Sequence, residues 1–583
     1  MDTINVPIRW DLDSLYYGLD INRLEKHIKD LLERLVAIEF DSYSKILGSH
    51  ELMIISEIIT EIESIESFYY CLTTEEVEAS SLRSLDTNIS TVKTKVRQIL
   101  LDVRKSLRNL SEEQYENWSH ITNNRFVSEL VKGGINESNA EREISSFSKE
   151  TLSSFEDMYI QLRDQIKVKA YFNHLHTELS FAEASRLAMS HTELPEKENI
   201  FKELNESVAL QANIFASIYN QMVGLRLTLY KMKSIDYLDE TLKVNGISKE
   251  ALDMMWGTVD NYREDFTTYL TIRAKELDKQ RLSWHEYTSS SEEVTYKITF
   301  KEAVDLLSDA LENIDSNMVE FVKEAISKKW VDAEQRQSKS PGGFCAPFIS
   351  KRESRISLSY DNSIDSARRL AHELGHAWHF RQMKNKPSLL FSDETFEMTM
   401  AETSSIFFET LFINHLIHHT KDITLKTAIL ESKLKRSLNY LTSIRAAFLF
   451  ENDFYECRKI GSLNLEKIEK LSLVSQEKAY SYALREYEPF MWMKYVQFYQ
   501  ASTPFYNYPY TFGFLLSTGL LEMAKTDERF PLKFQSFLSD TGTIPLELLI
   551  KKHFHIDLTQ PTFWQNSLAQ LKIDIESYKK YKT

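Results

Sequence analysis

The most informative stretch of the chain is Leu370-Ala371-His372-Glu373-Leu374-Gly375-His376-Ala377-Trp378-His379. Residues 366–380 contain no proline, so we expect a helix there. On a helix, His372 and His376 lie on one face about one turn apart, which suits two of the four tetrahedral positions of zinc. Glu373 can then take a proton from a water that the metal activates. The alternative is a buried helix with two hydrogen-bonded core histidines.

Zinc needs a third protein ligand, and Glu402 is the best candidate. The segment 400–409 reads as a second helix with few charges beyond Glu402 and Glu409, which are seven residues apart and so share a face. A carboxylate buried there needs a cation or several donors. We expect Glu402 to bind the metal and Glu409 to brace a ligating histidine, or else to form an ordinary buried ion pair. His379 lies too far along its helix, so we expect it to support the site or to pack.

The composition argues against two classes of partner. The 583 residues carry a formal net charge of −16, whereas nucleic-acid and anionic-membrane surfaces require clustered Lys and Arg. The three cysteines are isolated, which makes a disulfide framework or a thiolate zinc site improbable. The first residues lack the pattern of a signal peptide, and no apolar run is long enough to span a bilayer. We therefore expect a cytoplasmic protein without nucleic-acid or membrane partners.

The pattern of apolar residues predicts a mostly helical protein of more than one lobe. Only 14 Gly and 11 Pro interrupt the chain, and a length of 583 residues exceeds what one simple core accommodates. Apolar residues recur at helical spacing from about residue 20 to residue 179 and again from Pro195 to about Arg281. We place the boundary near residue 195, between a helical N-terminal lobe in residues 1–194 and a second lobe in residues 195–583.

A short β-sheet is expected just before the histidine helix. Gly342 and Gly343 belong to the only Pro-Gly-Gly cluster of the chain, and residues 355–360 then alternate polar and apolar side chains. This alternation predicts a strand with one buried face. An edge strand beside a peptidase site can pair with the backbone of an extended substrate. We therefore expect Gly342 and Gly343 to contact substrate.

Several motifs together resemble the M3 family of zinc peptidases, specifically its oligoendopeptidase F branch. The resemblance covers nearly the whole chain. It is carried by the histidine stretch quoted above and by four further blocks: Trp10-Asp11-Leu12-Asp13-Ser14-Leu15-Tyr16, Gly342-Gly343-Phe344-Cys345, Ala401-Glu402-Thr403-Ser404-Ser405 and Phe505-Tyr506-Asn507-Tyr508-Pro509-Tyr510-Thr511-Phe512-Gly513.

The resemblance implies a two-lobed helical fold with a deep central channel that admits short unstructured peptides. In this fold, residues 1–194 would form the lid of the channel and residues 195–583 the catalytic domain. It implies one zinc ion per chain, bound by His372, His376 and Glu402, with Glu373 as general base. It also implies that hydroxyls of the tyrosine-rich block stabilise the oxyanion of the transition state. Our candidates are Tyr508 and Tyr510. Packing of these rings at a helix start is the alternative.

The chain departs from the family in one segment. Relatives commonly place His-Phe-Tyr shortly before the tyrosine-rich block, and here the matching residues are Gln497-Phe498-Tyr499. An amide can donate a hydrogen bond but carries no positive charge, so activity is either reduced or retuned. We expect Gln497 and Tyr506 to contact substrate.

The leading interpretation is therefore a zinc endopeptidase that cuts internal bonds of oligopeptides. Two alternatives stay open. The chain could be a dedicated peptidase for one leader or signal peptide, with the same chemistry. It could also be a peptide-binding protein that retains zinc but turns over little, and Gln497 is the only feature that favours this reading.

Overall fold

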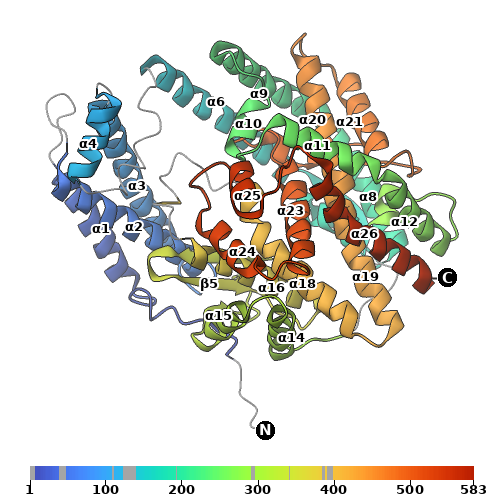
Figure 1. The fold of residues 1–583 in the computed structure, drawn as a ribbon. Coiled ribbons are helices and arrows are strands. Elements are labelled where there is room, and N and C mark those ends of the chain that lie inside the picture. Colours follow the sequence, from blue (N-terminus) through green and yellow to red (C-terminus); the bar gives the residue numbers. More distant parts are fainter. Residues whose placement is uncertain are drawn as a thin grey trace, which may run out of the picture. The chain divides into compact units, whose positions relative to one another are not determined.

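The computed structural model describes residues 7–38, 47–107, 110–122, 139–191, 193–289, 296–339, 342–383, 388–389 and 398–582 (Figure 1). The chain divides into two compact units, each built from three segments. Unit 1 comprises Met1–Asn139, Tyr296–His415 and Met523–His555, and unit 2 comprises Ala140–Thr295, Leu416–Glu522 and Ile556–Thr583. Both units take residues from either side of position 195, and the division into residues 1–194 and 195–583 stays a prediction.

Helices dominate both units, which confirms the expected mostly helical class. The helices of unit 1 are α1 (Ile21–Val36), α2 (Ser49–Leu72), α3 (Ala79–Leu107), α4 (Glu112–Thr122), α14 (Phe300–Glu312), α15 (Ser316–Ser327), η1 (Ile349–Lys351), α16 (Ile364–Gln382), α17 (Met398–Ala401), α18 (Thr403–His419), α24 (Phe530–Ser539) and α25 (Leu546–Phe554). Among the described residues, no helix is long and apolar enough to cross a membrane. The central channel stays a prediction.

Unit 2 is likewise helical, apart from one hairpin. Its helices are α6 (Asn139–Asp164), α7 (Phe181–Ser190), α8 (Leu194–Ala209), α9 (Ala212–Lys233), α10 (Asp239–Val244), α11 (Lys249–Asn261), α12 (Arg263–Glu276), α13 (Trp284–Tyr287), α19 (Ile423–Leu438), η2 (Asn439–Ser443), α20 (Ile444–Arg458), α21 (Leu465–Ala479), α22 (Met491–Lys494), η3 (Val496–Tyr499), α23 (Tyr508–Ala524) and α26 (Pro561–Lys582).

The hairpin corrects the expectation of an almost wholly helical pattern up to residue 179. Strands β1 (Lys167–Phe172) and β2 (Leu175–Ser180) pair antiparallel across a two-residue turn. The turn residues Asn173 and His174 have φ of 51° and 61°. Two positive φ angles in succession match the strand twist of a tight hairpin, and asparagine tolerates that conformation better than most residues.

The expected sheet beside the histidine helix is confirmed. Strand β5 (Glu353–Leu358) lies in the centre of a three-stranded sheet, parallel to β3 (Val331–Asp332) and antiparallel to β4 (Gly343–Phe348). Helix α16 packs on β5 and β4. The register pairs Gly343 with Leu358 and Phe348 with Glu353. Strand β4 is therefore an edge strand that begins next to the helix carrying His372 and His376.

The prediction that β5 has only one buried face is wrong. Residues 354–358 are all buried, and the N-terminal segment supplies hydrogen-bond partners for Arg355. Arg355 Nε donates to the Asp11 carbonyl at 2.9 Å, and Arg355 Nη2 donates to Ser14 Oγ at 3.1 Å. Alternating polarity therefore marks buried hydrogen-bonding groups here, not a solvated face.

The N-terminal helices position β4. Apolar residues of α1, α2 and α3 form one core cluster, and Ala346 and Phe348 of β4 belong to it. Helix α2 packs directly on β4. Burial of this cluster away from water therefore fixes the outer strand of the sheet.

A buried lysine fixes the connection between β3 and β4. Lys339 Nζ donates to the carbonyls of Asp332, Glu334 and Leu358 at 2.9, 2.8 and 3.0 Å. It also pairs with the Asp332 carboxylate at 3.1 Å. Burial lowers the pKa of Lys339. The ammonium group thus holds three carbonyls together close to the start of β4.

We expect Lys339→Met to lower the free energy of unfolding by about 3 kcal/mol, because breaking a buried charge pair leaves the remaining charge and carbonyls unsatisfied. Chemical denaturation monitored by circular dichroism measures this loss. The control is Lys301→Met, whose pair with Asp305 is more than half exposed and should contribute less than about 1 kcal/mol. Equal losses in the two variants would contradict the structural role of Lys339.

Candidate metal centre

Helix α16 presents His372 and His376 on one face. The helix begins after Ser363, whose hydroxyl accepts the Ser366 N–H at 3.0 Å and caps the first turn. The two imidazole rings are 4.8 Å apart between centroids. Burial lowers the pKa of His376 to about 4. This ring is therefore neutral near pH 7, which is the form that binds a metal.

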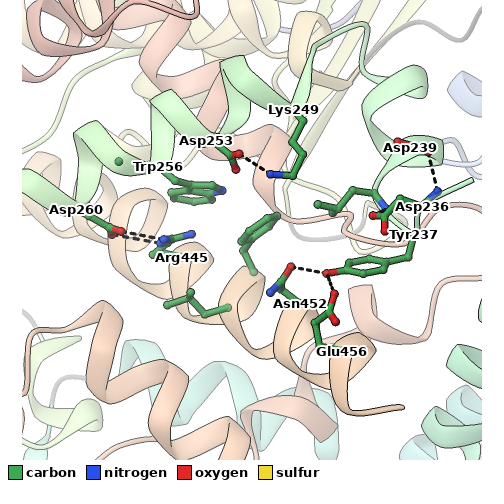
Figure 2. A pocket seen from close by; sticks show the side chains of 14 residues that line it. Asp236, Tyr237, Asp239, Lys249, Asp253, Trp256, Asp260, Arg445, Asn452 and Glu456 are labelled. Atoms are coloured by element: carbon green, nitrogen blue, oxygen red, sulfur yellow. Dashed lines mark hydrogen bonds and ion pairs between the residues drawn. The ribbon is translucent and has the colours of Figure 1, made fainter. Parts of the chain in front are cut away.

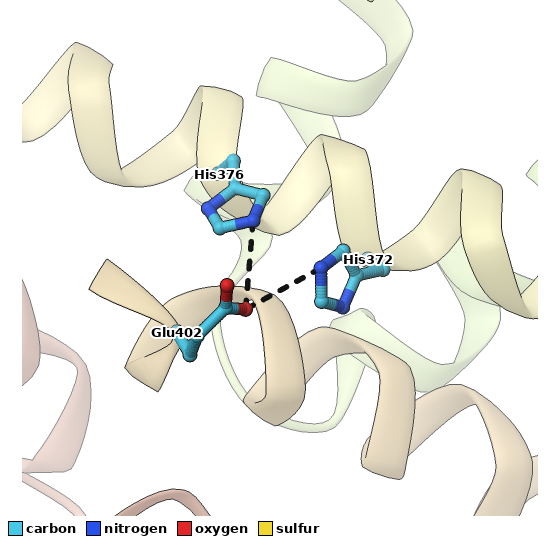
Figure 3. Close-up of side chains that lie close together, drawn as sticks. All are labelled: His372, His376 and Glu402. Atoms are coloured by element: carbon cyan, nitrogen blue, oxygen red, sulfur yellow. Dashed lines mark ion pairs between the residues drawn. The ribbon is translucent and has the colours of Figure 1, made fainter. Parts of the chain in front are cut away.

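Glu402 brings a carboxylate oxygen to both histidines. Its Oε2 lies 3.4 Å from His372 Nε2 and 3.6 Å from His376 Nε2 (Figure 3). Bonds of 2.0–2.2 Å at tetrahedral angles place zinc ligands about 3.4 Å apart. The two distances from the Glu402 oxygen therefore fit a zinc ion, and the three donor atoms all lie within 4.8 Å of one another. Ser405 Oγ donates to the same carboxylate oxygen at 2.8 Å and orients it.

The backbone at Glu402 differs from the continuous helix that was expected. Residue 402 is a turn residue between α17 and α18. Its carbonyl accepts the Ile406 N–H at 3.0 Å, so Glu402 occupies the capping position of α18. The prediction that Glu402 and Glu409 lie on one continuous helix is therefore wrong, because Glu402 precedes the first turn of α18. Both carboxylates nevertheless reach His372.

Glu409 combines the two interpretations that were left open. Its Oε2 lies 3.0 Å from His372 Nδ1 and 2.9 Å from Arg368 Nη1. The hydrogen bond raises the pKa of His372, opposing the lowering caused by burial. With Nδ1 as donor, the lone pair of Nε2 is left for a metal. Glu409 thus braces a histidine and forms a buried ion pair at the same time.

His379 points away from the three donor atoms. Its Nε2 lies 2.9 Å from Thr541 Oγ1, in the connection between α24 and α25. The side chain is buried, and burial lowers its pKa to about 3. Three residues can jointly approach a metal ion in the described part of the chain, namely His372, His376 and Glu402. This geometry agrees with a supporting or packing role for His379.

Glu373 lies beside the start of β4. A Cβ atom added to Gly343 would lie 3.0 Å from Glu373 Oε1 and 3.1 Å from the Ser357 carbonyl. Glycine is therefore required for β4 to approach the carboxylate this closely. The preceding residue, Gly342, has φ of +118°, which L side chains rarely adopt. Burial raises the pKa of Glu373 to about 7, which suits a group that takes up and releases a proton near neutral pH.

The remaining candidate residues belong to unit 2. Tyr508 is buried, and its hydroxyl donates to the Thr241 carbonyl at 3.2 Å. Tyr506 and Tyr510 are half-buried, with ring centroids 6.1 Å apart. Gln497 is half-buried in the short helix η3. A position of these four residues next to the metal ligands stays a prediction.

Sequence reasoning missed two residues that shape this centre. Arg368 lies one turn before His372 on α16, and this spacing could have indicated that both side chains reach Glu409. Gly375 lies between the two histidines, and its sequence position alone indicated no role. A Cβ atom there would lie 2.6 Å from the Ser404 carbonyl oxygen and 2.7 Å from Ser405 Cα. Gly375 therefore allows α16 to touch the backbone that follows Glu402.

We expect Gly375→Ala to weaken metal binding about 10- to 100-fold, because a methyl group would push the backbone after Glu402 away from the two histidines. Overpacking should also lower the free energy of unfolding by about 1–3 kcal/mol. Competition with a chelator of known affinity measures the first effect. The control is Gly257→Ala on α11, where no atom lies within 4 Å of the added methyl group, so that unfolding stability should stay equal or rise by up to about 1 kcal/mol. Unchanged metal affinity in Gly375→Ala would contradict the tight-contact argument.

Comparisons with known proteins identify the family of the chain. The sequence model of peptidase family M3 matches residues 197–570. An oligoendopeptidase F homolog of Borreliella burgdorferi is 21% identical over 99% of this chain and 98% of its own length. An oligoendopeptidase F homolog of Lactococcus lactis is 22% identical over 57% of this chain and 56% of its own length.

The fold is shared with solved structures at low sequence identity. A candidate peptidase from Chlamydophila abortus superimposes with a TM-score of 0.80 at 18% identity, covering 98% of both chains. Oligoendopeptidase-F from Enterococcus faecium superimposes with a TM-score of 0.68 at 15% identity, covering 96% of this chain and 99% of that one. The chain belongs to peptidase family M3, in its oligoendopeptidase F branch, and is a metalloendopeptidase.

Proposed function

We propose that this metallopeptidase uses zinc to hydrolyse internal bonds of short unstructured oligopeptides. The observation that carries the proposal is the convergence of His372 Nε2, His376 Nε2 and Glu402 Oε2 at tetrahedral spacing, with Glu373 one residue from a ligand. Relatives named oligoendopeptidase F support oligopeptides as substrates. One zinc ion per chain follows from the single set of three donors found in the described residues.

Zinc, when bound, lowers the pKa of a coordinated water to roughly 7 and polarises the scissile carbonyl. Glu373 accepts the proton of the attacking water and passes it to the leaving amine. Its burial beside β4 favours the protonated form, so that the proton is retained long enough to be transferred. Glu409 and Arg368 keep the His372 ring in the orientation that leaves Nε2 for the metal.

Strand β4 offers a backbone edge for an extended peptide. In the described part of the chain β4 pairs with β5 on one side, and no described strand pairs with its other edge. A substrate added there as a further strand would form main-chain hydrogen bonds that are independent of its sequence. Because Gly343 touches Glu373, such a peptide would run past the proposed general base.

We assign stabilisation of the oxyanion to the tyrosine-rich block of unit 2. One donor aimed at developing charge contributes roughly 2.7–4 kcal/mol to catalysis. Tyr510 and Tyr506 are the better candidates, because their side chains are half-buried whereas Tyr508 is fully buried. We assign a substrate contact to Gln497. A cytoplasmic location and the absence of nucleic-acid and membrane partners stay predictions.

We expect Glu373→Gln to retain zinc and to lose nearly all peptide cleavage, because the amide cannot accept the proton of the attacking water. Metal analysis of the purified variant, together with hydrolysis of a quenched fluorescent peptide, measures both properties. Wild-type protein treated with a chelator should also lose activity and should regain it on addition of zinc. If Glu373→Gln loses zinc and activity in parallel, Glu373 is a ligand and the proposed role is wrong.

We expect Glu402→Ala to lose zinc and His379→Ala to keep it. Removing one of three ligands weakens a tetrahedral site severely, whereas the His379 ring is directed at Thr541. Zinc content after dialysis against a weak chelator separates the two variants. His379→Ala should lower the melting temperature alone, since it removes a buried hydrogen bond. Zinc retained in Glu402→Ala and lost in His379→Ala would overturn the ligand assignment.

A further inference from the structure

The segment before α23 adopts a backbone conformation that its surroundings must impose. Residues 500–510, here called the tyrosine segment, connect η3 to the first turn of α23 and carry Tyr506 and Tyr510. Phe505 has φ of 56° although it is not glycine. L residues with large side chains rarely adopt this region, so the energetic cost must be offset by specific contacts.

A buried carboxylate binds the main chain at this strained residue. Glu451 on α20 is 1% exposed, and its Oε1 accepts the Phe505 N–H at 2.9 Å. Burial raises the pKa of Glu451 to about 7, although the Phe505 N–H opposes this shift. A buried acid is costly unless it has a partner, and here its partner is the backbone of the tyrosine segment.

A buried guanidinium fixes the other end of the same segment. Arg226 on α9 is 2% exposed and donates through Nη2 to the carbonyl of Gln500. Its Nη1 also donates to the Tyr455 hydroxyl at 3.4 Å. Glu451 and Arg226 therefore bond to main-chain atoms five residues apart. A loop held by packing alone would need neither of these buried ionisable side chains.

The Phe505 ring is enclosed by three aromatic rings. The centroids of Tyr455, Phe448 and Tyr237 lie 5.1, 5.6 and 5.7 Å from it. Phe448 and Tyr455 project from the same face of α20 as Glu451, since these residues are three to four apart. Figure 2 shows the Tyr237 hydroxyl bonded to Asn452 and Glu456, which also belong to α20.

Two of the carboxylates that line the cavity drawn in Figure 2 pair with cations of the same unit. The cavity has a volume of 570 Å³ and is lined by several carboxylates. Asp253 pairs with Lys249, and Asp260 pairs with Arg445. These two cavity carboxylates therefore already form ion pairs with side chains of unit 2. Tyr237 and Phe448 line this cavity and also pack against the Phe505 ring of the tyrosine segment.

We propose that Glu451 is a positioning residue, which fixes Phe505 in its strained conformation and thereby sets the direction of the Tyr506 and Tyr510 hydroxyls. The inference rests on the proposed function, in which these hydroxyls stabilise the oxyanion. A hydrogen-bond donor loses most of its catalytic effect when it is displaced by about 1 Å, so the tyrosines require a rigid support.

The test compares Glu451→Leu with Glu451→Gln. The leucine variant removes the acceptor, and kcat on a quenched fluorescent oligopeptide should fall about 10- to 100-fold. Zinc content should stay at the wild-type level, because the proposed ligands belong to unit 1. The glutamine variant keeps an acceptor oxygen and should lie within about threefold of wild type. Glu451→Asp keeps the charge but shortens the reach, so kcat should again fall about 10- to 100-fold. It replaces the leucine variant in the test if that variant does not fold.

A double-mutant cycle with Tyr506→Phe and Tyr510→Phe distinguishes positioning from general stability. If Glu451 acts through these hydroxyls, its removal should lower kcat by less than about threefold once they are absent. The control is Glu431→Gln on α19, which alters an equally buried carboxylate of unit 2 that pairs with Lys435 and Arg273. This control should lower the melting temperature without lowering kcat.

The outcomes separate this inference from the proposed function. Wild-type protein that binds zinc but cleaves no peptide would refute the proposed function. Cleavage by wild type together with an unchanged kcat in Glu451→Leu would overturn the role of Glu451 alone. Purely additive effects in the cycle would also overturn it, because Glu451 would then act independently of the tyrosines.

Discussion

The candidate metal centre depends on one close contact between two segments of backbone. Gly375 of α16 lies against Ser404 and Ser405, closer than any side chain would allow. The contact brings the turn at Glu402 up to the face of α16 that carries His372 and His376. Imidazole and carboxylate side chains are short, so a shift of this turn by the width of a methyl group would separate the donor atoms. The spacing of the ligands is therefore a packing property of unit 1.

The same helix also contacts the edge of the sheet. Because Gly343 permits β4 to approach Glu373, the proposed base lies next to the start of the edge strand and directly follows the candidate ligand His372 on α16. The buried ammonium of Lys339 fixes the connection that leads into β4, and the N-terminal helices pack on the strand itself. Residues far from the centre in sequence thus determine where a peptide could run past it.

Sequence reasoning succeeded where the chemistry is local. The four-residue spacing of His372 and His376 fixes their shared face on any helix, and two acids in an otherwise apolar segment correctly marked Glu402 and Glu409 as neighbours of histidine. It failed where tertiary contacts decide. The polar residues of β5 are buried because the N-terminal segment supplies partners. The hairpin β1–β2 depends on two positive φ angles. The spacing of apolar residues along the sequence does not reveal that each unit consists of three segments.

The distribution of residues between the units has a chemical consequence. All three candidate ligands, the proposed base and the free strand edge belong to unit 1, whereas the tyrosines, Gln497 and Glu451 belong to unit 2. The candidate metal ligands are therefore brought together by the packing of unit 1. Turnover, as we propose it, additionally requires the strained tyrosine segment of unit 2. Mutations in unit 2 can then alter catalysis while leaving the affinity for zinc intact. A chain that retains zinc but cleaves slowly would be explained by a change in the support of the oxyanion donors and not by a defective metal site.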